Sequence, residues 1–291
     1  MTIPVPNLTK ALEQALRNES DTWDNSSLHV SDLSVGLSLD QGGTCHRQLW
    51  LRLQGYEKKE PSIGQRLMWD NGKRIELRAN ELVSEPLERQ GWQLLFTGDK
   101  TVELPGGIIG AYDALLVHES GIVLVMDNKT VRGNAFNYMN EARESHVIQV
   151  QGYIKAIDAH GGVLWYKDRE GQNRPMEFFV PRDDNAVNNC SGVALSIQEM
   201  TEPPPVIYPQ ISLKENKNSV SIVARERWQC SYCDYQDVSC SGALPYDWRS
   251  KGGKVVGHIK DDEVVLKEEC QEIEPLVEAV QELEPEGSLP F

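Results

Sequence analysis

Hydrophobic residues recur at different spacings along the chain, and each spacing predicts a different kind of element. Leu8, Leu12 and Leu16 lie four residues apart, which is typical of one face of an amphipathic helix. Comparable patterns follow later in the chain. The pattern over residues 62–90 contains Asn71–Gly72 and Pro86, and we expect these residues to interrupt the helix. Helices are therefore expected over residues 7–18, 62–90, 142–158 and 184–200, with a short helix beginning near Cys45.

Between the helical patterns, short apolar runs predict strands. From residue 92 onwards the runs are WQLLFT, TVEL, IIGAYDALLV and IVLVMDNKT, separated by the turn-type sequences TGDK, PGG and HESG. Two more runs, VLWYK and PMEFFVP, follow the third helical pattern. The order of helix, several strands, helix and strand predicts an α/β fold with a mixed sheet core flanked by helices.

Charge is distributed unevenly along the chain. The 291 residues carry a formal net charge of −15 at pH 7. Residues 261–291 contain eleven acids and one base, so this segment carries −10 and the first 260 residues only −5. Any surface that binds nucleic acid must therefore be local. We expect an N-terminal helical extension over 1–40, a main domain over 41–245 and an acidic, partly disordered tail over 246–291.

The chain contains no segment that predicts membrane insertion or export. No apolar run approaches the roughly 18 residues that a membrane span needs. The N-terminal segment lacks the basic start and apolar core of a signal peptide. We therefore expect a cytoplasmic protein that meets no membrane. In that reducing compartment, patterned cysteines are more often metal ligands than disulfide partners.

Two carboxylates and a lysine converge in the segment from residue 107 to residue 130. Its two apolar runs flank a short turn, which predicts a hairpin that sets Asp113 roughly opposite Asp127. Because side chains alternate along a strand, Asp127 and Lys129 share one face and Asn128 points to the other. Neighbouring carboxylates repel each other unless a cation joins them. A divalent cation, Mg²⁺ or Mn²⁺, meets that need and can activate water beside a phosphate.

This segment resembles the core of the PD-(D/E)XK nucleases. Asp113 corresponds to the first carboxylate and Asp127-Asn128-Lys129 to the D-x-K. The aspartate that gives the family its name commonly follows a proline, and Tyr112 stands in that place here. Without its context D-x-K is a common sequence, so an ordinary Asp–Lys pair at a strand end is the alternative interpretation.

Two flanking segments extend the resemblance to the RecB-like members of this family. Downstream, Gln149 and Tyr153 form a Q-x-x-x-Y motif, and their spacing of four places both on one helical face. Upstream, Glu76 lies four residues after Gly72, where the family carries a metal-binding residue that is often His. A surface glutamate is the alternative there. The resemblance implies a metal site of Glu76, Asp113, Asp127 and Asn128, and a catalytic set of Asp113, Asp127, Lys129, Gln149 and Tyr153.

The cysteines indicate a second metal centre. Cys230 and Cys233 form a C-x2-C pair that lets both thiolates reach one metal, and Cys240 follows closely. A complete site needs a fourth ligand, for which Cys45 is the best candidate. One cysteine before the core and three after it resembles the RecB-like iron–sulfur nucleases, which include the AddB nuclease domain and the nuclease of CRISPR adaptation modules. The resemblance implies a 4Fe-4S cluster, with zinc as the alternative occupant.

The resemblance implies a restriction-endonuclease-like fold and a Mg²⁺- or Mn²⁺-dependent deoxyribonuclease that hydrolyses DNA phosphodiester bonds. The expected substrate is a single-stranded DNA end, which would make the protein an exonuclease. The alternatives are a catalytically silent subunit for DNA binding or assembly, and a structure-specific endonuclease. Repair, recombination, phage replication and CRISPR adaptation all remain open as pathways, and a protein partner is expected beside the DNA.

Overall fold

The computed structural model describes residues 26–96, 100–215, 220–242, 244, 253–260, 263–268 and 270. The helix predicted over residues 7–18 lies outside them. The chain divides into two compact units, described separately here: Met1–Tyr56 with Glu60–Pro204, and Glu57–Lys59 with Pro205–Phe291. The domain predicted over 41–245 contains residues of both units.

A five-stranded mixed sheet forms the centre of the first unit. Its strands lie in the order β1-β4-β5-β6-β7 and are β1 (Trp92–Phe96), β4 (Ala114–His118), β5 (Val123–Val131), β6 (Gly161–Asp168) and β7 (Met176–Pro181). Strands β5 and β6 run parallel, and the other neighbours are antiparallel. A parallel pair needs a crossover connection, which α4 (Gly133–Phe136) and α5 (Glu144–Ile157) supply.

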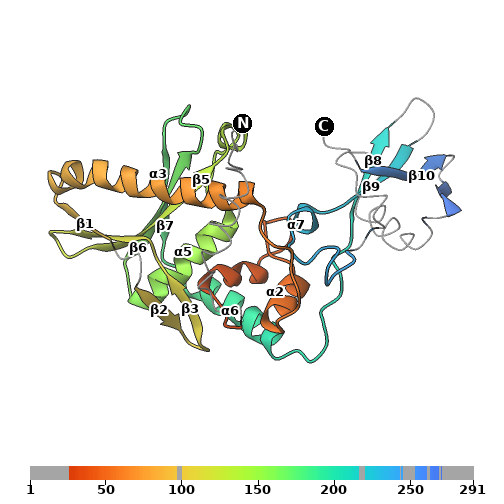
Figure 1. Cartoon of the computed structure of the whole chain (residues 1–291), viewed down its shortest axis with the longest axis horizontal. Coiled ribbons are helices and arrows are strands. Elements are labelled where there is room, and N and C mark those ends of the chain that lie inside the picture. The colour runs from red at the N-terminus through yellow and green to blue at the C-terminus, as the bar shows by residue number, and fades with distance from the viewer. Residues whose placement is uncertain are drawn as a thin grey trace, which may run out of the picture. The chain divides into compact units, whose positions relative to one another are not determined.

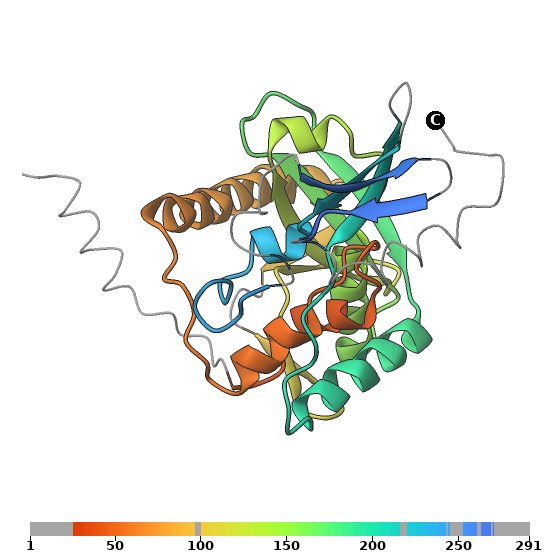
Figure 2. The same cartoon turned by 90° about the vertical axis from the view of Figure 1, so that its right-hand side faces the viewer.

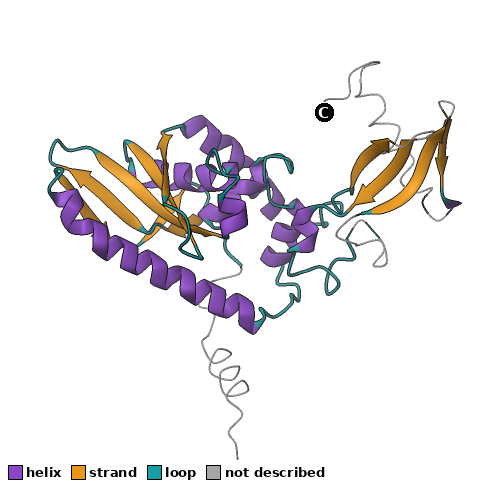
Figure 3. Ribbon diagram, turned by 90° about the horizontal axis from the view of Figure 1, so that it is seen from above, coloured by secondary structure: helices purple, strands orange, loops and turns teal. Residues whose placement is uncertain are grey.

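The long helix α3 (Ile63–Glu88) packs on one face of this sheet and α5 on the other (Figures 1 and 3). Val83 of α3 packs against the cluster that contains Met126. On the opposite face, a Cβ added to Gly162 would lie 2.4 Å from Val150 of α5. The mixed sheet flanked by helices, predicted from the hydrophobic pattern, is thereby confirmed.

Helix α3 is continuous, so the interruptions predicted at Asn71–Gly72 and Pro86 are wrong. A capping box between Ser62 and Gln65 closes its first turn. Gly72 faces the sheet, because a Cβ there would come within 3.3 Å of Thr130 Oγ1. The glycine lets the helix approach β5 closely, and packing on the sheet outweighs its low helix propensity.

Smaller elements complete the first unit. The 3-10 helix η1 (Val30–Gly36) contacts α5 and α6 (Asp184–Gln198), and α2 (His46–Leu53) contacts α6 (Figure 2). Strands β2 (Thr101–Leu104) and β3 (Ile108–Ala111) form a separate hairpin just before β4. Among the described residues, no helix is both long and apolar enough to cross a membrane.

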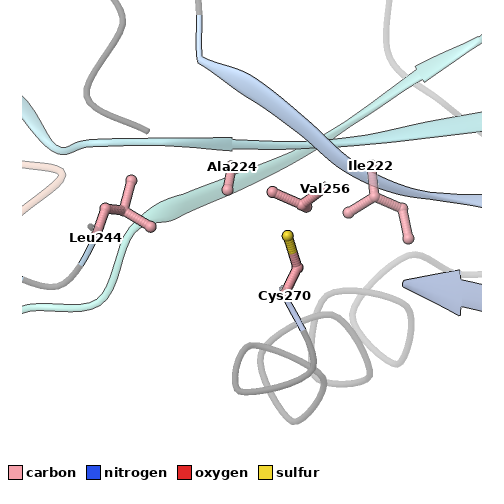
Figure 4. Close-up of a cluster of buried hydrophobic side chains, with 5 residues drawn as sticks. All are labelled: Ile222, Ala224, Leu244, Val256 and Cys270. Atoms are coloured by element: carbon pink, nitrogen blue, oxygen red, sulfur yellow. The ribbon is translucent and has the colours of Figure 1, made fainter. Parts of the chain in front are cut away.

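A four-stranded antiparallel sheet forms the centre of the second unit. Its order is β11-β10-β9-β8, with β8 (Gln210–Glu215), β9 (Val220–Arg225), β10 (Lys254–Lys260) and β11 (Glu263–Leu266). The buried core on this sheet consists of Ile222, Ala224, Leu244, Val256 and Cys270 (Figure 4). The hydrophobic pattern gave no expectation of this sheet, and β10 and β11 lie within the residues 246–291 expected as an acidic tail.

Candidate active site

The β4–β5 hairpin brings Asp113 and Asp127 together. Ala114 pairs with Met126, so the register continues to the two aspartates that flank this pair. Asp113 lies in the break between β3 and β4, and its Oδ2 accepts a hydrogen bond of 2.6 Å from the backbone N of Asn128. Asp127 is only 3% exposed. The Asp113 carboxylate is therefore held by the backbone of β5, the strand that carries Asp127.

On the α5 face of β5, Lys129 connects Asp127 with two polar side chains of the helix. Its Nζ lies 2.8 Å from Asp127 Oδ2 and donates a hydrogen bond of 2.8 Å to Gln149 Oε1. Gln149 Nε2 in turn donates to Tyr153 OH at 3.2 Å. Since residues four apart share one face of a helix, the D-x-K and Q-x-x-x-Y residues form a single polar row.

On the α3 face of β5 lie Asn128, Glu76 and Lys167. Asn128 Oδ1 accepts a hydrogen bond from Lys167 Nζ. Burial raises the pKa of Glu76, and the neighbouring Lys167 and Asn128 side chains, which lower it, offset part of that rise. The Glu76 charge also acts on Asp113. Glu76 therefore shares the α3 face with Asn128 and Lys167, and its charge reaches the paired aspartates.

Negative charge is in excess at this site. Burial, together with the charges of Asp127 and Glu76, raises the pKa of Asp113 to about 7. The hydrogen bond from Asn128 N and the charge of Lys129 act in the opposite direction without cancelling that rise. A carboxyl group that is buried and faces other carboxylates keeps its proton up to neutral pH unless a cation takes the proton's place.

The two aspartates of the hairpin are of the chemical kind that binds a hard divalent cation. Asp127 Oδ2 is buried and receives no hydrogen bond, although Lys129 Nζ lies 2.8 Å away. Carboxylate oxygens are the ligands that Mg²⁺ and Mn²⁺ prefer. Within the described part of the chain, no group of three or more His, Cys, Asp and Glu side chains is placed to hold a metal ion. A cation between Asp113 and Asp127 would therefore complete its shell with backbone oxygens or water, as Mg²⁺ commonly does.

Two aromatic side chains that sequence reasoning missed lie beside the polar row. His146 Nδ1 lies 2.7 Å from Tyr166 OH, and this hydroxyl also accepts a hydrogen bond of 3.2 Å from the backbone N of Arg143. Burial and the charges of Lys129 and Arg143 lower the pKa of His146 to about 3, so its ring is neutral at pH 7. His146 precedes Gln149 by three residues, and this helical spacing is the signal that could have found it.

A cavity of about 580 Å³ lies at the N-terminal end of α5. Tyr138, which is 86% exposed, and Arg143 are among its lining residues. Asp40, Glu141 and Glu144 also line it, so its acidic residues outnumber the arginine. The cavity is therefore better suited to an aromatic ring than to a cluster of phosphates.

The expected cysteine ligands are distributed over both units. Cys45 is the N-cap residue of α2 in the first unit, and the other three lie in the second. Cys230 belongs to the short helix α7 (Trp228–Ser231). The backbone N of Cys233 donates a hydrogen bond of 3.0 Å to the carbonyl oxygen of Cys230. Cys240 follows in the same loop. The described residues do not show an iron–sulfur site, so the cluster stays a prediction.

The mixed sheet, its covering helices and the buried Asp127 beside a lysine define an α/β protein compatible with a nuclease fold. No family model matches the chain, and no curated protein matches it. The crystal structure of SSO0001 is similar, with a TM-score of 0.50, 18% identity, and 82% of this chain and 98% of that chain covered. This likeness supports the fold.

Two exonucleases of known structure are also similar, at lower scores. An alkaline exonuclease from Laribacter hongkongensis matches with a TM-score of 0.43 and 12% identity, over 59% of this chain and 86% of its own. A phage-related exonuclease from Haemophilus somnus 129PT matches with a TM-score of 0.40 and 16% identity, over 60% and 92%. Likeness at this level carries no argument about activity, which must come from the site itself.

Proposed function

We propose that this protein is a metal-dependent deoxyribonuclease that uses Asp113, Asp127 and Lys129. The observation that carries the proposal is the excess of buried negative charge beside a lysine. The pKa of Asp113 is raised to about 7, and the Asp127 carboxylate is buried with Lys129 Nζ 2.8 Å from its Oδ2. Such an arrangement is costly for a fold that binds no cation. An ordinary Asp–Lys pair at a strand end would be solvated, whereas Asp127 is 3% exposed.

The residues of the hairpin and of α5 have separate tasks in this proposal. Asp113 and Asp127 would hold the cation, with Glu76 and Asn128 assisting. A bound Mg²⁺ or Mn²⁺ would supply an acidified water and offset charge on the phosphate. Lys129 would orient the attacking water or stabilise the negative charge that develops on the phosphate. Its ammonium group is suited to this because Asp127 and Gln149 fix it from two sides.

The preferred substrate is a single-stranded DNA end, and the protein would then be an exonuclease. Support comes from the cavity at the start of α5, whose volume of about 580 Å³ leaves room for an unpaired nucleotide. Tyr138 offers an exposed ring for stacking, and Arg143 offers one cation for a phosphate. The backbone N of Arg143 donates to Tyr166 OH, which also contacts His146 on α5.

We assign Cys45, Cys230, Cys233 and Cys240 to a separate 4Fe-4S cluster with a structural role, and zinc is the alternative occupant. Support comes from the C-x2-C spacing, the turn that links Cys233 to Cys230, and the family resemblance. Iron, sulfide and zinc analysis of protein purified without oxygen tests the assignment. Iron and sulfide in equal amounts support it, and stoichiometric zinc would replace it.

The test of the proposed function is cleavage of end-labelled DNA by the full-length chain with Mn²⁺. Three substrates separate the possibilities: linear single strands, linear duplexes and circular single strands. We expect the linear single strands to be shortened, the circles to stay intact and EDTA to stop the reaction. Cutting of the circles would favour an endonuclease. Binding without cutting by folded, metal-loaded protein would favour the silent subunit, and a partner protein would then be sought.

A further inference from the structure

Lys167 is a buried lysine at this site, on the face of β5 opposite Lys129. It is 4% exposed and pairs with Thr130 in the parallel register between β5 and β6. Its Nζ donates a hydrogen bond to Asn128 Oδ1 and lies 3.7 Å from the ring centre of Trp165. An ammonium group is seldom buried unless negative charge or polar partners compensate it.

The compensating charge comes from the carboxylates of the candidate active site. Asn128 links Lys167 to this site, because its Oδ1 accepts a hydrogen bond from Lys167 Nζ and its backbone N donates to Asp113 Oδ2. The Lys167 charge also favours the charged form of Glu76. Lys129 is engaged on the other face, with Asp127 and Gln149. Each face of β5 thus presents one lysine to the same group of carboxylates.

We propose that Lys167 is a positioning residue that serves as a built-in counter-charge for this site. It orients Asn128 and stabilises the carboxylate cluster when no metal is bound, and it competes electrostatically with the divalent cation. The inference rests on the proposed function, because the cation concerned is the one that the nuclease would use. A lysine with a merely structural role in β6 would affect folding and leave metal affinity unchanged.

The direction of the effect follows from charge alone. Two cations that face the same carboxylates repel each other, and partly buried surroundings strengthen that repulsion relative to water. Neutralising Lys167 should therefore tighten Mn²⁺ binding by about three- to tenfold. Without bound metal, the same change leaves the carboxylates with less compensation, so the metal-free protein should unfold at a lower temperature.

Four variants separate charge from packing. Lys167→Gln keeps a polar contact with Asn128, and Lys167→Met keeps the apolar packing on Trp165. Both remove the charge, whereas Lys167→Arg retains it. Lys155→Gln is the matched control, because Lys155 on α5 also donates to an asparagine, Asn188, outside the carboxylate cluster.

The experiment is a Mn²⁺ titration of the full-length, DNA-free protein, followed by the free-Mn²⁺ resonance signal. Thermal unfolding with EDTA or with Mn²⁺ accompanies it. We expect tighter binding and a larger Mn²⁺-induced rise in Tm for both neutral variants. Lys167→Arg and Lys155→Gln should match the wild type within about twofold. A neutral variant that folds only with Mn²⁺ would also support the proposal, because the metal would then replace the missing positive charge.

Two results would overturn it. Equal Mn²⁺ affinity in the wild type and in both neutral variants would remove the counter-charge role and leave the nuclease proposal standing. A wild-type chain that binds no Mn²⁺ would remove the metal-dependent function and this inference with it. The two failures are thus distinguishable in one titration series.

Discussion

The two faces of strand β5 carry polar groups of similar kinds that are satisfied to different degrees. On the α5 face, Lys129 contacts Asp127 and Gln149, and Gln149 contacts Tyr153. Each side chain of this row fixes the next one. The row can therefore hold the lysine ammonium in one place, which is what a group acting on a transition state requires.

The α3 face is less completely satisfied. Lys167 and Asn128 are paired, but burial still raises the pKa of Glu76. One turn further along α3, Asn80 is 1% exposed, and neither polar atom of its side chain has a hydrogen-bond partner. Under the proposed function, the α5 face would orient the reacting groups and the α3 face would regulate the charge of the site.

The largest effect is expected from Asp127→Asn. The change removes one charge from the cation site and the partner of Lys129 while preserving the side-chain shape. Cleavage should fall by at least about a thousandfold. Initial rates on single-stranded DNA with Mn²⁺ check this, with Asp184→Asn as the control, because Asp184 pairs with Arg182 on the surface of α6. Comparable rates for both variants would place the reaction elsewhere.

Asp113→Asn should stabilise the metal-free protein at alkaline pH. The folded-state pKa of Asp113, about 7, exceeds its ordinary value of 3.8, so the folded protein holds this proton more tightly. Protonation of Asp113 therefore contributes to the free energy of unfolding. This contribution is complete below pH 3.8 and is lost as the pH rises to about 7. At pH 8 the variant should therefore be more stable than the wild type by up to about 3 kcal/mol.

Denaturant unfolding in EDTA at pH 4.0 and pH 8.0, roughly the two ends of this window, measures that difference. The shifted pKa of His146 has the opposite sign, but it is common to both proteins and cancels in the comparison. The difference between variant and wild type should nearly vanish at the acid end. A difference that is independent of pH would show that Asp113 is an ordinary carboxylate.

Gln149→Ala should have an intermediate effect, because it frees Lys129 from α5 and leaves both aspartates in place. Single-turnover cleavage should slow by about ten- to a hundredfold, with Mn²⁺ affinity unchanged. Tyr153→Phe removes only the hydroxyl that holds Gln149 and should slow cleavage by about twofold to fivefold. Loss of Mn²⁺ binding in Gln149→Ala would mean that the glutamine supports the metal and not the lysine.

The smallest effect is expected on the α3 face from Asn80→Leu. A buried amide without partners costs stability, so an apolar side chain of similar size should raise the free energy of unfolding by about 1 kcal/mol. Denaturant unfolding measures this, and cleavage should be unaffected. A loss of stability instead would show that Asn80 has a partner, such as a bound water.

The sequence was most informative where short-range geometry decides the outcome. The turn between two apolar runs sets the hairpin register that places Asp113 near Asp127. Helical spacing alone places Gln149 and Tyr153 on one face. The sequence did not predict Lys167 as a site residue, because its position depends on the parallel register between β5 and β6. The whole crossover through α5 determines that register. Local spacing carries no information about such a register.

The second sheet was not predicted from the sequence, for a different reason. The acidic composition beyond residue 260 suggested a solvated tail and obscured the short apolar alternation of β10 and β11. Val256 and Cys270 are fully buried there, in a core shared with β9. The net charge of a segment reflects its surface residues and does not exclude a strand. A few apolar residues in alternation are enough for a strand to pair with its neighbour.

The most direct test of the central claim compares the wild type with Lys129→Ala on end-labelled single-stranded DNA with Mn²⁺. Lys155→Ala serves as the control, and Mn²⁺ binding is measured for each protein. The site predicts cleavage by the wild type and by Lys155→Ala. It predicts a rate lower by at least about a thousandfold for a folded Lys129→Ala that still binds Mn²⁺. Undiminished cleavage by Lys129→Ala would contradict the assignment of this hairpin as a nuclease active site.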